Sequence, residues 1–114
     1  MNDQEVEQAI QAKGKTAPRI TPADIQAAIS GEFTFTVGNA ARALNCPVSG
    51  ATDLLTICVL TLRNGFTVSG ESACASPENF DAEIGRKIAR ANAEQKIWAL
   101  EGYRLKESLH QQAQ

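Results

Sequence analysis

The segment LLTICVLTLRNGFTVSGESACA, residues 54–75, decides the fold because it predicts a β-hairpin. Two runs rich in Val, Ile, Leu and Thr are separated by Asn64-Gly65, a dipeptide favoured in two-residue type I′ turns. Such β-prone runs on both sides of a turn are typical of paired antiparallel strands. We therefore predict strands over residues 54–62 and 66–74.

The turn also predicts the register of this hairpin. If Arg63 and Phe66 flank a two-residue turn, Val59 lies opposite Gly70. A glycine that faces a branched side chain indicates a bulge, a bend or the close approach of another element. The first strand, residues 54–62, is apolar on both faces, as expected for the central strand of a sheet.

The segment after the hairpin predicts a long helix that covers the sheet. Ser76 is placed to cap this helix, and Pro77 suits its first position. Apolar residues then recur at steps of three and four, so they are expected to face the sheet. Gly102 is the expected end of the helix. The expected apolar stripe consists of Phe80, Ile84, Ile88, Ala91 and Trp98, with Gly85 and Ala89 beside it, where a backbone could come close.

A short helix and a third strand are predicted before the hairpin. In TPADIQAAISG, Thr21 is placed to cap, Pro22 suits the first helical position and Gly31 suits the end. The next segment, residues 32–38, alternates with Phe on one face and Thr on the other, which predicts a half-buried strand. The fold predicted is α+β: a small antiparallel sheet with a β-hairpin, covered by one long C-terminal helix and one short N-terminal helix.

The length and composition of the chain suit one domain. It has 114 residues, of which 43% are hydrophobic, enough for a modest core. We expect an N-terminal arm and linker at 1–19, a single α+β domain at 20–105 and a polar C-terminal tail at 106–114. The segment 39–53 shows no regular period, although residues 40–44 could form one helical turn.

The charge pattern disfavours several partners. The formal net charge is -2, so the chain has no general attraction for nucleic acid or anionic lipid. No run approaches the roughly 20 apolar residues that cross a bilayer, and we expect the protein in the cytosol. The odd set of cysteines favours reduced thiols, and we expect neither a metal site nor a cofactor. The chain has three cysteines, Cys46, Cys58 and Cys74, and a single histidine, His110.

Several short elements occur together in the order NGF, GES, NFD, G...A...A and W...GY. With these elements, residues 20–105 closely resemble a family of small tailed-phage and prophage proteins named for gene product forty-nine of a coliphage and gene product sixty-six of a Shigella phage. The resemblance implies a phage or prophage accessory gene whose product acts in the cytoplasm of a bacterial host. The resemblance identifies no functional residue in this chain.

Four polar residues are candidates for a binding site. Glu71 and Ser72 could form a polar pair in a pocket, but without a nearby histidine they do not make a nucleophile and its base. Arg86 and Arg90 belong to the one concentrated basic group and could hold a phosphate or an acidic partner. The alternative for these arginines is a solvated helix face with intrahelical ion pairs.

Two aromatic residues complete the candidate set. Trp98 and Tyr103 lie near one end of the predicted helix, where they could stack a base or anchor an interface. Core packing is the alternative explanation for Trp98. The surface expected to be used lies where the C-terminal end of the hairpin meets the helix.

The sequence favours binding over catalysis. It contains no metal cluster, catalytic triad or phosphate loop, so we predict a non-catalytic phage accessory protein that binds and inhibits or sequesters a host component, such as a host protein. One alternative is an oligomeric sponge that traps a host nucleotide signal; another is a small hydrolase or other enzyme. We also expect a homodimer or higher homo-oligomer, since a strand that is apolar on both faces needs more cover than two helices supply.

Overall fold

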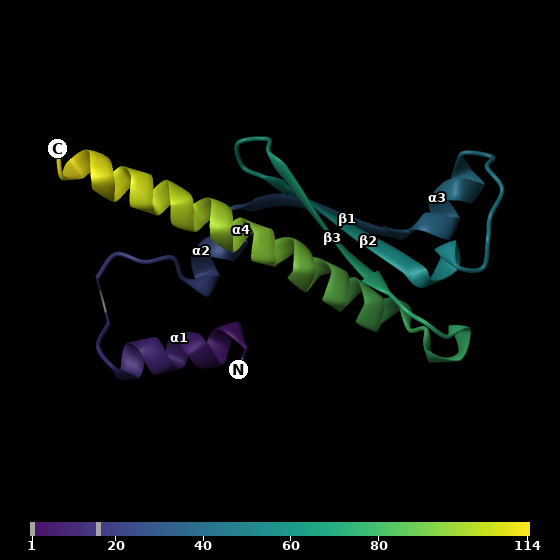
Figure 1. The fold of residues 1–114 in the computed structure, drawn as a ribbon, viewed down its shortest axis with the longest axis horizontal. Coiled ribbons are helices and arrows are strands. Elements are labelled where there is room, and N and C mark those ends of the chain that lie inside the picture. Colours follow the sequence, from purple (N-terminus) through teal and green to yellow (C-terminus); the bar gives the residue numbers. More distant parts are fainter. Residues whose placement is uncertain (1, 16) are drawn as a thin grey trace.

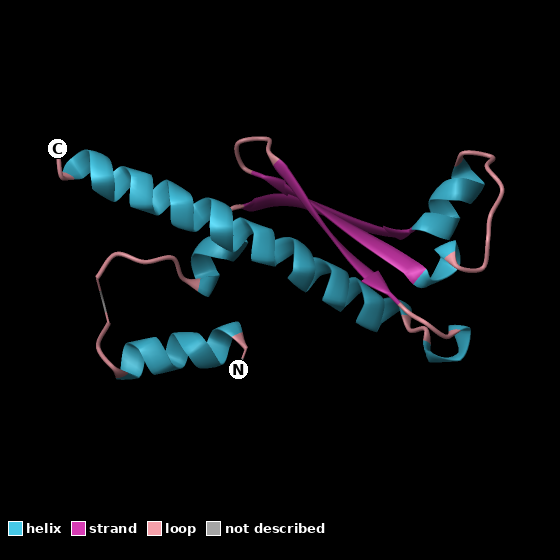
Figure 2. Ribbon diagram, viewed as in Figure 1, coloured by secondary structure: helices cyan, strands magenta, loops and turns pink. Residues whose placement is uncertain are grey.

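The structure is a computed structural model that describes residues 2–15 and 17–114. It confirms the α+β class: a three-stranded antiparallel sheet in the order β1-β2-β3 is covered on one face by a long helix, as Figures 1 and 2 show. The strands are β1 (Ile29–Thr36), β2 (Leu55–Leu62) and β3 (Thr67–Ala73). The helices are α1 (Asp3–Ala12), α2 (Pro22–Ala27), α3 (Val37–Ala43) and α4 (Ala82–Gln112), with single 3-10 turns at Thr52–Leu54 and Pro77–Asn79.

The hairpin forms where it was predicted, but the predicted turn type and the predicted register were wrong. The connection has three residues, because the Leu62 amide donates to the Phe66 carbonyl at 2.8 Å. Gly65 has φ +90°, whereas Asn64 stays outside the left-handed region that a type I′ turn needs at both positions. The Asn64 side chain instead accepts from the Phe66 amide at 3.0 Å.

This extra loop residue shifts the pairing by one. Gly70 lies opposite Cys58 rather than Val59. A one-residue shift exchanges the faces of a strand, so Cys58 and Leu60 point toward α4, while Val59 points to the other side of the sheet. β2 is the central strand, as expected from its two apolar faces.

The contact between α4 and the sheet is made by small residues. A Cβ added at Gly70 would lie well within 3.0 Å of the Ala89 carbonyl oxygen and the Ala93 backbone nitrogen. A Cβ at Gly85 would meet the Thr56 hydroxyl at 3.0 Å. The predicted close approach at Gly70 is therefore real, and its cause is the α4 backbone. We call this contact the seam.

The predicted apolar stripe of α4 was wrong. The buried residues of this helix are Gly85, Ala89, Ala93 and Ile97, spaced four apart, whereas Ile84, Ile88 and Ala91 are exposed. The seam needs small side chains, so the large apolar residues lie on its flanks. Trp98 is half-buried on the side of α4 that meets α1.

Both predicted ends of the long helix were also wrong. Ser76 makes no side-chain cap, and Pro77 opens only a 3-10 turn that ends where Phe80 becomes extended. The helix begins at Ala82, with the Asp81 carboxylate accepting from the Ile84 amide at 3.0 Å. It runs through Gly102 to Gln112, and Figure 1 shows it extending far beyond the sheet.

The N-terminal elements follow their capping signals more closely. Thr21 and Asp24 form a capping box around Pro22, as the sequence predicts for the start of α2. The helix ends earlier than the predicted Gly31, because β1 already begins at Ile29. Within the N-terminal arm, α1 is tied to the linker by Glu7 and Arg19, whose side chains approach to 2.5 Å.

Only one face of the sheet is covered by the described helices. The helix face carries Thr56, Cys58 and Leu60 of β2, all buried. The opposite face, which we call the open face, carries the alternate residues of each strand. These are Gly31, Phe33 and Phe35 of β1, Leu55, Ile57, Val59 and Thr61 of β2, and Thr67, Ser69, Glu71 and Ala73 of β3.

Candidate functional site

A groove with polar and apolar walls opens between β1, β2 and the first turns of α4. Its volume is about 510 Å³. Because α4 packs mainly on β3 and β2, the C-terminal half of β1 is left beside the helix rather than beneath it. We call this feature the threonine groove. It is lined by Thr34, Phe35, Thr36, Asn39, Thr56, Phe80, Ala82, Glu83 and Arg86.

Three hydroxyl groups from two strands meet in this groove. Thr36 lies directly opposite Thr56, and Thr34 is two residues before Thr36 on the same face. The Thr36 hydroxyl is committed to structure, since it accepts from the Asn39 amide at 3.3 Å and caps α3. No local sequence pattern predicts this cluster, because Thr34 and Thr56 become neighbours only through strand pairing.

The hydroxyl oxygen of Thr34 is buried and makes no hydrogen bond within the described part of the chain. Across the strands it faces the thiol of Cys58, a weak donor. Burial raises the pKa of Cys58, and the contact with Thr34 opposes this rise without cancelling it. A buried polar atom without a strong partner is costly, because it has lost its hydrogen bonds to water.

Arg86 supplies the positive charge at the margin of the groove. Its neighbour Glu83 pairs with Lys87 at 3.4 Å, one turn along the helix. Arg86 takes part in none of the ion pairs formed by the described residues, and its side chain is exposed. Its guanidinium donors are thus uncommitted, and they can bind an acceptor-rich group.

Arg90, by contrast, is held by three elements. Its Nε donates to Glu32 of β1 at 2.9 Å, its NH2 group contacts Gln26 of α2 at 3.1 Å, and it also pairs with Glu94 on its own helix. Burial lowers the pKa of Arg90, but the bond to Glu32 and the charge of Glu94 outweigh this and raise it. Arg90 therefore joins α4 to the sheet.

Glu71 and Ser72 point to opposite sides of the sheet. Glu71 lies on the open face, beside Ile57 in the neighbouring strand. Its carbonyl oxygen accepts from the side chain of Asn92 at 2.8 Å, which satisfies one group on the free edge of β3. Ser72 points toward α4 and lines a cavity of about 130 Å³ beside Gly85. The two residues do not form a pair in one pocket.

The aromatic candidates lie apart from the threonine groove. Trp98 donates from its indole nitrogen to Asp3 of α1 at 3.2 Å, in a cavity lined also by Ile20 and Pro22. Tyr103 is 75% exposed, farther along α4. The structure thus places only Arg86, of the six predicted residues, in the threonine groove.

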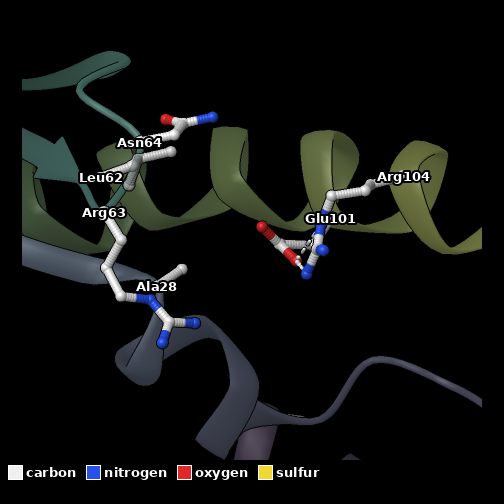
Figure 3. Close-up of a pocket in the computed structure, with 6 residues that line it drawn as sticks. All are labelled: Ala28, Leu62, Arg63, Asn64, Glu101 and Arg104. Atoms are coloured by element: carbon white, nitrogen blue, oxygen red, sulfur yellow. Dashed lines mark hydrogen bonds and ion pairs between the residues drawn. The ribbon is translucent and has the colours of Figure 1, made fainter.

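A second polar cavity of about 180 Å³ lies at the hairpin turn. Figure 3 shows Glu101 and Arg104 pointing toward one another from α4, with Arg63 and Asn64 on the hairpin across from them. The Arg104 guanidinium donates to Glu101 at 2.7 Å, and this bond raises the pKa of Arg104. The predicted helix end at Gly102 hid this cavity, because it placed Arg104 outside the helix.

The threonine groove is equipped to bind by hydrogen bonds. Hydroxyls, one amide, one guanidinium and the carboxylate of Glu83 line it, together with the aromatic residues Phe35 and Phe80. Glu83 is paired with Lys87, which offsets its charge. Among the residues that the structure describes, no group of three or more His, Cys, Asp or Glu is placed to hold a metal ion. In the same part of the chain, no helix is both long and apolar enough to span a membrane.

The fold and the groove together define a small two-layer α+β protein with a groove beside its long helix. Comparison with protein-family models matches residues 20–109 to the phage protein (N4 Gp49/phage Sf6 gene 66) family. The chain belongs to this family of phage proteins, as its sequence elements indicated. Comparison with curated proteins and with solved structures gave no match.

Proposed function

We propose that this chain is a non-catalytic phage accessory protein that binds a host component in the threonine groove, within the bacterial cytoplasm. One observation carries the proposal: the uncommitted guanidinium of Arg86 lies at a groove that is also lined by three threonines. Arg86 forms no ion pair within the described part of the chain, and an acidic group of a ligand would supply one.

The chemistry of the groove favours an acidic segment of a host protein. Arg86 can donate two parallel hydrogen bonds to a carboxylate, and Asn39 can donate or accept beside it. Phe80 offers an apolar surface to a neighbouring side chain of the ligand. The net charge of the chain is -2, so attraction to an acidic segment would be local to this site.

The test compares Arg86→Glu with Lys106→Glu, a charge reversal farther along α4. Lys87 is unsuitable as the control because it pairs with Glu83 of the groove. Tagged wild-type protein is expected to capture a stoichiometric host protein from bacterial lysate, and Arg86→Glu is expected to weaken that complex about 10- to 100-fold, since a charged hydrogen bond contributes about 1.5–3 kcal/mol. Lys106→Glu changes the same charge on an exposed residue of α4 outside the groove and should keep the affinity within a few-fold.

Arg90 is unsuitable for this test, because its reversal would break the contacts to Glu32 and Gln26. Equal affinity of wild type and Arg86→Glu, with unchanged thermal stability, would rule out the groove as the binding site. Failure to capture any stoichiometric host protein would count against a protein ligand.

The volume of the groove, about 510 Å³, also suits a small molecule, and this keeps the nucleotide-sponge alternative as a second candidate. A panel of nucleotides in a thermal-shift assay tests it. A nucleotide at ~100 times its dissociation constant stabilises the native state by about 2.7 kcal/mol. The stabilisation should disappear in Arg86→Glu if the groove is the site. No observation on the groove favours a hydrolase.

A further inference from the structure

The open face of the sheet is an apolar surface that the described helices leave uncovered. Phe33 stacks on Phe35, with ring centroids 5.7 Å apart, and Phe33 is 60% exposed. Beside them, Ile57 and Val59 of the central strand are only half-buried. Antiparallel sheets commonly leave one face to solvent, but that face is then polar. Here its centre is aromatic and aliphatic.

The molecule as a whole exposes more surface than its mass requires. Its accessible surface is 7749 Å², whereas a compact monomer of 12.2 kDa exposes about 6,100 Å². Its radius of gyration is 17.8 Å, against about 13 Å for a compact domain of this length. This surplus, roughly 1,600 Å², belongs to the whole elongated chain, whose longest axis is 56 Å, and the open face is one part of it.

We propose that the open face packs against the open face of a second copy of this chain. Of the eleven residues on the face, Glu71 is the one with a charge. A nucleic acid, a membrane surface or a strongly charged protein therefore finds no complementary charge there. The side chains at its centre have the character of a domain core cut in half, which is typical of homodimer interfaces.

A second copy of the chain is also always available to cover such a face. A core-like surface needs cover from the time the chain folds, and another copy of the chain is present whenever the protein is made. The strands are about 25 Å long and the sheet about 14 Å wide, so the flat contact is about 350 Å² per copy before side chains are counted. A contact of this size is at the small end of specific interfaces, so the dimer is expected to be weak.

The distribution of side chains across the face fits a two-fold axis. An axis near the Phe33–Val59 pair brings the aromatic half of each sheet onto the other, with the sheets about 10 Å apart and their strands about 30° from parallel. Thr67, Ser69 and Glu71 of β3 then lie at the solvated rim. The two copies of Glu71 fall on opposite sides of the interface, where they do not repel.

The test uses two exposed phenylalanines that differ in the face they occupy. Phe33 is 60% exposed on the open face, and Phe66, at 55%, lies by the edge of β3 near Lys96 and Leu100. Phe33→Thr and Phe66→Thr both remove an aromatic ring and keep a residue suited to strands. Sedimentation equilibrium of the full chain over 1–300 μM measures the dimer dissociation constant.

Wild type and Phe66→Thr are expected to dimerise with similar constants. Phe33→Thr should raise the dissociation constant at least tenfold, because each dimer carries the substitution twice. Val59→Thr, a change of similar shape on the same face, should act in the same direction and guards against a local effect of Phe33. A monomeric wild type up to 300 μM would overturn the proposal, as would equal constants for wild type, Phe33→Thr and Val59→Thr. Circular dichroism of each variant verifies that it is folded.

Discussion

The two faces of the sheet solve the problem of burial in opposite ways. On the helix face, Gly70 meets Ala89 and Ala93, so backbone packs almost directly on backbone. On the open face, Phe33 and Val59 present large apolar side chains to no described element of the chain. The difference teaches that the two layers are joined by close backbone packing and a small buried core, while the open face keeps exposed apolar side chains that a second layer from outside can cover.

The alternation along β2 makes this contrast visible within one strand. Cys58 and Leu60 have no exposed surface, whereas Ile57 and Val59 between and beside them are half-buried. Neighbouring residues therefore belong to two different environments. Substitutions on the helix face should act on folding of the monomer, and substitutions on the open face on association.

The largest effect is expected for Gly70→Ala. The new methyl group would overlap backbone atoms of Ala89 and Ala93, which cannot move without displacing α4. We expect a loss of more than about 4 kcal/mol, which leaves a domain of ordinary stability partly or fully unfolded. Urea denaturation followed by circular dichroism measures the loss.

The control for this substitution is Gly102→Ala. Gly102 is an exposed helical residue with open space around its Cα, so alanine should stabilise α4 by about 0.5–1 kcal/mol. Opposite signs for the two variants would confirm the seam. A loss below about 1 kcal/mol at Gly70 would show that α4 does not lie on the backbone of β3 as closely as described.

The fold could be predicted from local signals, but the way its layers meet could not. The capping box at Thr21 and the turn at Asn64-Gly65 act over a few residues, and both elements were found. Asn-Gly suits two-residue and three-residue turns alike, so the register was missed by one. The stripe of α4 was missed because hydrophobicity favoured Ile84 and Ile88, whereas close packing selects Gly85 and Ala89.

The candidate site was harder to predict than the fold. Arg86 was named from its charge and its place in a basic group, and it does line the groove. Arg90 is also an arginine, one turn farther along the helix, but its hydrogen bond to Glu32 of β1 occupies its guanidinium. Thr34 and Thr56 are far apart in the sequence, and only the pairing of β1 with β2 brings their hydroxyls to one groove.

The second prediction compares the two faces directly. Leu60→Ala removes a fully buried side chain from the helix face and should cost about 3 kcal/mol of unfolding free energy. Val59→Ala, on the adjacent residue, should cost less than about 1 kcal/mol at low micromolar concentration, where the open face is free of a partner. Denaturation of both variants at 2 μM and 200 μM measures the difference.

Protein concentration sharpens this comparison. The cost of Val59→Ala should grow at 200 μM, because dimerisation then stabilises the wild type more than the variant. The cost of Leu60→Ala should change little. Equal costs for the two variants at low concentration would mean that the faces do not differ as the structure describes.

The smallest effect is expected at the loose margin of the helix face, where Thr34 and Thr36 lie two residues apart. Thr34→Val replaces the buried unpaired hydroxyl with a methyl group of similar shape and should stabilise the domain by about 1 kcal/mol. Thr36→Val removes the cap of α3 and should destabilise it by about 1 kcal/mol. Thermal unfolding of the two variants, with wild type in parallel, should therefore shift in opposite directions. A destabilised Thr34→Val would mean that the hydroxyl already has a partner, such as the Cys58 thiol across the strands or a bound water.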